Sequence, residues 1–165
     1  NGHSFEVRVY AEDPMNNFLP DIGTLSTYRR PQGLGVRVDD GFEEGMEIPI
    51  YYDPMISKLI TFGKDREEAR LRMLRAIEDY EISGVETTLA FCKFALKHDA
   101  FISGNFDTNF VKHYFTPDKL EHDIEVEDEI ASLMAVRLFE SDKKASIQVA
   151  DNGGSTKSNW KANRM

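Results

Sequence analysis

The sequence predicts an α+β fold, a small antiparallel sheet with helices packed on it. Strict alternation of apolar and polar residues over 5–10 and an apolar run over 55–62 indicate two strands. Glycine and proline recur at short intervals between these runs, which is typical of antiparallel strands joined by tight loops. Apolar residues at helical spacing follow from residue 65 onward. The 165 residues have room for one such domain and a tail.

Charge and composition argue against several classes of protein. The chain carries 20 basic and 29 acidic residues, a net charge of -9, and neutralising the phosphates of a nucleic acid would require clustered lysine and arginine instead. It has no apolar run of about eighteen residues that would span a membrane. Cys92 is the single cysteine, which excludes an internal disulfide and favours a cytoplasmic location.

The first expected strand, residues 5–10, separates two kinds of side chain. One face is apolar and the other polar, with Phe5, Val7 and Val9 opposed to Glu6, Arg8 and Tyr10. An exposed arginine on such a strand most simply forms a surface ion pair with a nearby acid. The residues alone therefore favour a structural role for Arg8.

Further extended segments are expected at 23–30, 36–38 and 47–52, before the strand at 55–62. The Gly33-Leu34-Gly35 run at the start of the 36–38 segment superficially resembles a dinucleotide-binding loop. However, Val38 holds the position of the third glycine, and the segment joins strands instead of opening a helix, so the motif fails.

A helix is expected over residues 65–80. Asp65 and Glu68 form a capping pattern at its start, and Glu68 and Arg72 have the spacing and order of a favourable helical ion pair. A short strand at 81–83 is expected to follow.

Two more helices are expected at 88–98 and 109–114. The first of them is apolar on most sides, which predicts deep burial and an inert thiol for Cys92.

The composition predicts three regions. Residues 1–115 carry the periodic apolar pattern of a folded domain. Residues 116–150 are expected to form an acidic linker and an accessory helix at 128–140, since seven of the twelve residues over 118–129 are acidic. The polar residues 151–165 are expected to form a disordered tail.

Spacing alone reveals neither a catalytic constellation nor a metal site. The chain contains no phosphate-binding loop of the Walker type. Its four histidines are scattered at spacings that fit no metal centre: His3, His98, His113 and His122.

Five runs, in order over residues 2–115, resemble the signatures of biotin carboxylases. They are GHSFEVRVYAEDP at 2–14, NFLPDIG at 17–23, RVD at 37–39, YYDPMISKL at 51–59 and ISGVETT at 82–88. The corresponding family patterns are G-H-A-(I/V)-E-x-R-(I/V)-x-A-E-D-P, F-L-P-S-x-G, V-R-x-D, Y-Y-D-(P/S)-M-(I/L)-x-K-L and I-x-G-(V/I)-x-T-N. Departures occur at Ser4, Asp21 and Thr88, where alanine, serine and asparagine are usual. The chain thus resembles the C-terminal domain of a biotin carboxylase from an acetyl-CoA or propionyl-CoA carboxylase type of enzyme.

The resemblance implies the C-terminal domain that completes an ATP-grasp enzyme. The parent enzyme would carboxylate N1 of biotin with bicarbonate and ATP, the biotin being carried on a carrier protein. An N-terminal part of the same chain would bind ATP and Mg²⁺. The 165 residues by themselves are expected to be inactive and to bind none of these cofactors.

The resemblance also reverses the interpretation of Arg8. In the family, the arginine of E-x-R stabilises negative charge on the ureido oxygen of biotin, and Arg8 stands at this position. Glu6 would steer Arg8, while Tyr52 and Asp53 would line the same biotin pocket, although Asp53 can equally cap a turn.

Partners follow from the same resemblance. Leu34 and Arg37 stand at positions that form a dimer contact in bacterial members, which implies a homodimer. The biotin carboxyl carrier protein and a carboxyltransferase would be the other partners, and a separate carrier subunit is favoured if Met165 is the natural end. The final acceptor, as in fatty acid biosynthesis or another pathway, stays open. Two alternatives also stay open: another ATP-grasp carboxylase, or a non-enzymatic interaction or dimerisation module.

Overall fold

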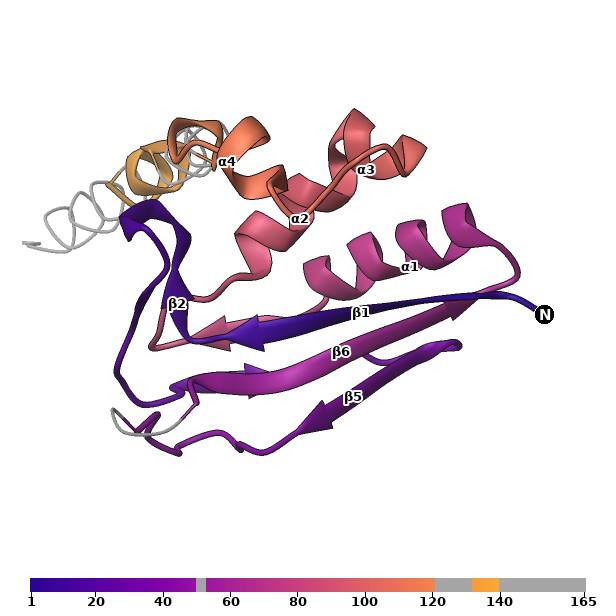
Figure 1. Cartoon of the computed structure of the whole chain (residues 1–165). Coiled ribbons are helices and arrows are strands. Elements are labelled where there is room, and N and C mark those ends of the chain that lie inside the picture. The colour runs from indigo at the N-terminus through magenta and orange to yellow at the C-terminus, as the bar shows by residue number, and fades with distance from the viewer. Residues whose placement is uncertain (50–52, 121–131, 140–165) are drawn as a thin grey trace, which may run out of the picture. The chain divides into compact units, whose positions relative to one another are not determined.

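The computed structural model of the protein describes residues 1–49, 53–120 and 132–139. Its centre is a three-stranded antiparallel sheet in the order β1–β6–β5 (Figure 1). The strands are β1 (His3–Tyr10), β6 (Met55–Gly63) and β5 (Val36–Asp40). The predicted α+β class with antiparallel pairing is therefore confirmed.

Two shorter antiparallel ladders accompany the central sheet. One joins β2 (Glu12–Asp13) to β3 (Leu19–Pro20), and the other joins β4 (Thr27–Arg29) to β7 (Glu81–Ser83). The expectation of tight loops holds for the first of these ladders. It is wrong for β1 and β6, which pair although the whole segment 11–54 separates them.

The extended segments at 23–30 and 47–52 contribute less sheet than expected. The first supplies β4 and an isolated bridge from Thr24 to Glu47, and this bridge is the pairing found in the described part of 47–52. Residues 50–52 of that segment lie outside the described residues. The loop at 33–35 leads directly into the strand β5, as expected for a segment that joins strands and does not open a helix.

Helix α1 (Arg66–Glu78) lies against the central sheet (Figure 1). Asp65 caps it by accepting a 2.8 Å hydrogen bond from the Glu68 N–H, and Glu68 in turn accepts one of 2.6 Å from the Lys64 N–H. The expected ion pair between Glu68 and Arg72 is present at 3.1 Å. Core side chains from the sheet and this helix pack together, among them Val7, Val9, Ile56, Leu59, Met73, Ala76 and Ile77.

Helix α2 (Leu89–Lys97) is less buried than expected, with Leu89 and Leu96 as its buried residues. Its outer side instead joins a partly exposed aromatic cluster, in which Phe91 and Phe94 contact Phe18 and Phe115 at ring distances of 4.9–5.6 Å. One side of the helix therefore joins the hydrophobic core through Leu89 and Leu96, and the other side joins the aromatic cluster. Burial nevertheless raises the pKa of the Cys92 thiol to about 12, which fits the expected inert cysteine.

Helices α3 (Asp99–Ser103) and α4 (Phe110–Tyr114) complete this part of the fold together with η1 (Pro14–Asn16). Helix α4 matches the expectation at 109–114. Helix α3 was not expected: the His98 ring nitrogen accepts a hydrogen bond from the Ala100 N–H, and this cap starts a new turn where α2 ends.

The chain divides into two compact units, Asn1–Glu121 and His122–Met165. Residues 118–120 are helical where the acidic linker was expected to begin, and residues 132–139 are helical within the expected accessory helix. The rest of the expected linker and the expected tail at 151–165 lie outside the described residues. Within the described ranges, no helix combines the length and apolar content that a membrane crossing requires.

Candidate functional site

The polar face of the central sheet carries the predicted site residues of β1. Because Val7 and Val9 are buried in the core shared with α1, Glu6 and Arg8 point to the opposite face. The register places Arg8 beside Lys58 of β6, and Lys58 beside Asp39 of β5. A charged row therefore crosses all three strands, and Lys58 is a member of it that sequence reasoning missed.

Arg8 is held by neighbours on its own strand. Its Nε lies 3.2 Å from Oε1 of Glu6, and the two side chains are 57% and 44% exposed. Hydrogen bonds to the side chains of Tyr10 and Glu6 raise the pKa of Arg8 above its ordinary value, so its charge is permanent. The guanidinium is thus oriented, charged and accessible from solvent.

The β1–β6 ladder changes register between Val9 and Tyr10, one residue after Arg8. Val9 pairs with Ser57 and Tyr10 with Met55, so Ile56 is the extra residue of a bulge. On the free edge of β1, the hydroxyl of Thr88 accepts a 3.1 Å hydrogen bond from the Tyr10 N–H and donates one of 3.3 Å to the Arg8 carbonyl oxygen. Sequence reasoning noted Thr88 as a departure from the family pattern and missed this contact.

Asp53 lies near Glu12 of β2. Its Oδ1 accepts a 3.1 Å hydrogen bond from the Met55 N–H, which is the turn-capping role that the sequence left open. Burial, and next the negative charge of Asp53, raise the pKa of Glu12. Tyr52, the other predicted pocket residue, lies outside the described residues.

The two predicted dimer residues lie at the β5 side of the sheet. Leu34 is 88% exposed in a turn in which Gly33 and Gly35 have positive φ angles of 139° and 73°. Arg37 binds Asp39 through two hydrogen bonds of 2.7 Å each. Its register partner is Ile60, which pairs on its other side with Glu6, so Arg37 shares the polar face with Arg8.

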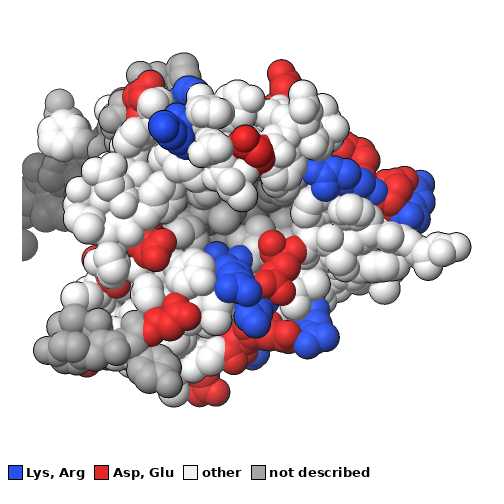
Figure 2. Space-filling view, viewed as in Figure 1, with Lys and Arg blue, Asp and Glu red and all other residues white. Residues whose placement is uncertain are grey.

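Basic and acidic side chains are intermixed on the face of the molecule shown in Figure 2. In the view of Figure 2, basic and acidic side chains lie next to one another near the middle of the surface, without a large patch of one sign. The paired residues Glu6 with Arg8 and Arg37 with Asp39 follow this pattern. In the described part of the chain, no group of three or more histidine, cysteine, aspartate or glutamate side chains is arranged to hold a metal ion.

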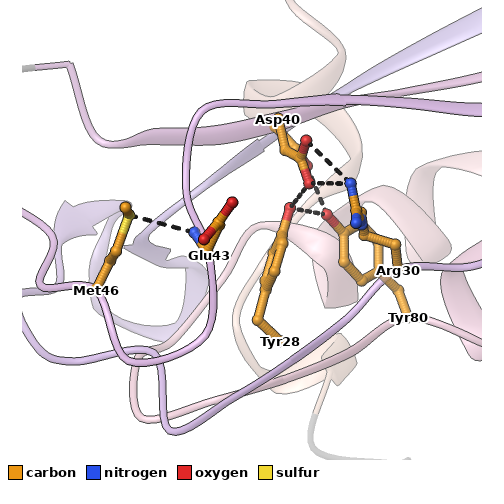
Figure 3. Close-up of polar contacts among 7 residues, drawn as sticks. Tyr28, Arg30, Asp40, Glu43, Met46 and Tyr80 are labelled. Carbon is orange, nitrogen blue, oxygen red and sulfur yellow. Dashed lines mark hydrogen bonds and ion pairs between the residues drawn. The ribbon is translucent and has the colours of Figure 1, made fainter.

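A cavity of about 410 Å³ beside Tyr28 is a second candidate site. Figure 3 shows the polar contacts of Tyr28, Arg30, Asp40 and Tyr80. The hydroxyl oxygens of Tyr28 and Tyr80 lie 2.7 Å apart, and Tyr28 also donates to Asp40 at 3.2 Å. Arg30 pairs with the same carboxylate at 3.2 Å, while Ser57 contacts the Tyr80 hydroxyl at 2.8 Å. Burial raises the pKa of both tyrosines, so they stay neutral. These polar groups bind one another, which makes the cluster a structural network.

A family model for the biotin carboxylase C-terminal domain matches residues 6–113. The chain belongs to the biotin carboxylase C-terminal domain family. The resemblance predicted from the sequence motifs is therefore confirmed. The matched range contains Glu6, Arg8, Asp53 and Thr88.

Curated relatives of this biotin carboxylase domain are much longer than the chain. Biotin carboxylase 1 of Bacillus subtilis is 48% identical over 113 residues, which are 68% of this chain and 25% of that protein. The alpha chain of human mitochondrial propionyl-CoA carboxylase is 45% identical over 138 residues, 82% of this chain and 19% of that protein. The chain thus spans about a quarter or less of these relatives. The match to the propionyl-CoA carboxylase chain covers too many residues to end at residue 115. The similarity therefore extends beyond residue 115, where the sequence showed no family motif.

Solved biotin carboxylases share the fold. The biotin carboxylase domain of a thermophilic 2-oxoglutarate carboxylase, bound to bicarbonate, superposes with a TM-score of 0.68 at 43% identity, covering 69% of this chain and 26% of that one. The biotin carboxylase subunit of a pyruvate carboxylase gives a TM-score of 0.69 at 40% identity, covering 73% and 26%.

Proposed function

We propose that the chain is the C-terminal part of an ATP-dependent biotin carboxylase, which attaches the carboxyl group of bicarbonate to N1 of biotin. Relatives named for propionyl-CoA, methylcrotonoyl-CoA, pyruvate and 2-oxoglutarate share this domain. Because their acceptors differ, the shared domain serves the step that precedes the acceptor. In our proposal that step is the carboxylation of biotin.

The oriented guanidinium of Arg8 is the observation that carries the proposal. ATP would phosphorylate bicarbonate to carboxyphosphate, which would break down to CO₂ and phosphate. Biotin would lose its N1 proton to the released phosphate, the ureido oxygen would gain negative charge, and N1 would then form a bond to the carbon of CO₂. Arg8 would stabilise this oxygen, since a permanently charged group already fixed by Glu6 requires little reorganisation in the transition state.

The remaining predicted residues receive narrower roles. Glu6 orients Arg8 through the 3.2 Å contact. Asp53 shapes the turn that enters β6 and brings a second carboxylate near Glu12 of β2. We assign Tyr52 to the wall of the biotin pocket from the resemblance, and ATP and Mg²⁺ to the upstream ATP-grasp part of the full-length chain.

The proposed assembly is a homodimer that works with a biotin carrier and a carboxyltransferase. One solved neighbour is named as a biotin carboxylase domain dimer, and it matches this chain with a TM-score of 0.68. The high exposure of Leu34 fits a side chain that becomes covered by a second subunit. The match to the propionyl-CoA carboxylase alpha chain covers 82% of this chain, which favours an acyl-CoA acceptor. The free Cys92 fits a reducing compartment such as the cytoplasm.

Replacement of Arg8 by lysine in the full-length enzyme tests the proposal. Arg8→Lys keeps the charge but loses the planar donor fork, and removing one preorganised donor typically costs on the order of 10²–10³ in rate. We therefore expect turnover in biotin-dependent carboxylation to fall by this amount, while ATP affinity and melting temperature stay near those of the parent.

Arg29→Lys is the matched control. Arg29 is also exposed and pairs with Glu81 at 3.0 Å, but it lies on β4, outside the central sheet. An exposed pair contributes at most about 1 kcal/mol to stability, so this variant should keep normal turnover. Near-normal turnover of Arg8→Lys with a lowered melting temperature would instead make Arg8 structural and favour an interaction module.

A further inference from the structure

We infer that Thr88 is the positioning residue that fixes Arg8 on the sheet, an inference that rests on the proposed function. Arg8 lies on a strand at an open edge of the central sheet. Because β1 is the outer strand in the order β1–β6–β5, the N–H and C=O groups of every second residue point away from β6. The groups that point outward next to the guanidinium are the N–H and carbonyl of Arg8 and the N–H and carbonyl of Tyr10.

Thr88 binds three of these four outward groups. Its hydroxyl accepts from the Tyr10 N–H at 3.1 Å and donates to the Arg8 carbonyl oxygen at 3.3 Å. Its own N–H donates to the Tyr10 carbonyl oxygen at 3.1 Å. One residue thus closes the free edge of β1 on both sides of Val9, at the point where the ladder changes register.

The side chain of Thr88 is itself held in a fixed place. Thr88 is 5% exposed and precedes α2, whose first turn is bound to it by a 2.9 Å hydrogen bond from the Cys92 N–H to the Thr88 carbonyl oxygen. Thr88 lies 78 positions after Tyr10 in the chain. It therefore links β1, the strand of Arg8, to the start of α2. Glu6 lacks this property, because it belongs to the same strand and moves with Arg8.

The contact needs a side chain that both donates and accepts, and in this chain the hydroxyl of Thr88 supplies both. Within one oxygen atom, a hydroxyl both donates and accepts, whereas the branched side chain of valine has the same shape and does neither. Loss of the hydroxyl would leave the Tyr10 N–H and the Arg8 carbonyl without these partners beside the bulge. The backbone there would then relax, and the guanidinium at the end of its long side chain would move with it.

The test compares Thr88→Val, Thr88→Ser and Thr61→Val in the full-length enzyme. Thr61 is fully buried on the other face of β6, and its hydroxyl donates one 2.9 Å hydrogen bond to the Ala69 carbonyl oxygen of α1. Thr61→Val therefore removes a buried hydroxyl bond by the same change of side chain, and Thr61 pairs with Phe5 of β1, away from the contacts of Arg8 and Tyr10 with Thr88. Melting temperature, amide hydrogen exchange at Tyr10, KM for ATP and kcat for biotin carboxylation are measured for each variant.

Thr88→Val should speed exchange of the Tyr10 amide and lower kcat by roughly 10- to 100-fold with an unchanged KM for ATP, since small misplacements of a reacting group have effects of this size. Thr88→Ser should restore both, and Thr61→Val should lower the melting temperature while keeping kcat and Tyr10 exchange normal. Unchanged Tyr10 exchange, or a kcat reduced no more than in Thr61→Val, overturns the inference. A parent enzyme without biotin-dependent carboxylation overturns the proposed function instead, and the exchange data still decide whether Thr88 holds the edge.

Discussion

Glu12 and Glu67 are two carboxyl groups whose surroundings shift the pKa in opposite directions. Burial, with the nearby charge of Asp53, raises the pKa of Glu12. Hydrogen bonds from Arg70, at 2.6 Å and 2.8 Å, lower the pKa of Glu67. A raised pKa means that the charged form of Glu12 weakens the fold, and a lowered one means that the charged form of Glu67 strengthens it.

Replacement of each glutamate by glutamine should therefore have opposite effects near neutral pH. Glu12→Gln should raise the unfolding midpoint of the chain at about pH 7, because it removes a charge that folding disfavours, and this gain should vanish below the unfolded pKa of about 4.3. Glu67→Gln should lower the midpoint at about pH 7, and this loss should shrink as the pH falls through the lowered pKa of the folded state. Denaturant midpoints measured between about pH 7 and pH 3 check both signs. Equal effects of either variant at the two ends of this range would contradict the stated causes.

Local residue contacts were predictable from the sequence, and distant ones were not. Alternation placed Glu6 and Arg8 on one face of a strand, and the structure brings them to 3.2 Å. Asp65 and Glu68 capped α1 as their spacing indicated. No local sequence pattern predicted the hydrogen bonds between Thr88 and β1, because they join residues that are 78 positions apart in the chain.

At the scale of elements, Gly63 decides how closely α1 approaches β6. A Cβ atom at Gly63 would lie 2.5 Å from the Ala69 backbone nitrogen and 2.9 Å from the Glu68 carbonyl carbon. Both atoms belong to the helix backbone, which cannot turn aside as a side-chain tip would. The end of the strand and the first turn of the helix therefore fit together only when residue 63 lacks a side chain.

Gly63→Ala should destabilise the domain by about 1–3 kcal/mol, the usual cost of overpacking a tight contact. Gly41→Ala is the matched control, since a Cβ there meets nothing within 4 Å and Gly41 has no positive φ angle. That change should be neutral or slightly stabilising, because alanine restricts the unfolded chain. Chemical denaturation of the two variants beside the parent measures the difference, and equal midpoints would mean that the helix shifts freely away from the strand.

Elements defined by local pattern were predicted well, and their partners were predicted poorly. The strand at 5–10 and the helix at 65–80 appear close to their expected bounds. The sequence did not predict that β1 pairs with β6, nor that α2 is only partly buried. Periodicity records which face of an element is apolar, whereas the neighbour that covers this face is chosen by the whole chain.

At the scale of the molecule, the first compact unit should be stable without the second. Limited proteolysis of the chain should cut first between residues 118 and 129 or after 151, where the apolar periodicity of the sequence is weak or absent. A chain shortened to residues 1–121 should unfold cooperatively with the same denaturant midpoint as the full 165 residues, since the unit Asn1–Glu121 contains the hydrophobic core of the described residues. Early cleavage within 65–98, or a lower midpoint of the shortened chain, would contradict this division.

The ladder between β1 and β6 also limits the order in which parts of the chain can fold. Its two strands are connected through the segment 11–54, so forming it requires closure of a long loop before any strand contact offsets the lost chain entropy. Doubling such a loop adds only about 0.6 kcal/mol, which means that insertions there slow folding more than they weaken the folded state. Although Arg8 is among the first of these residues to leave the ribosome, the sheet that carries it can form only after Gly63 has emerged.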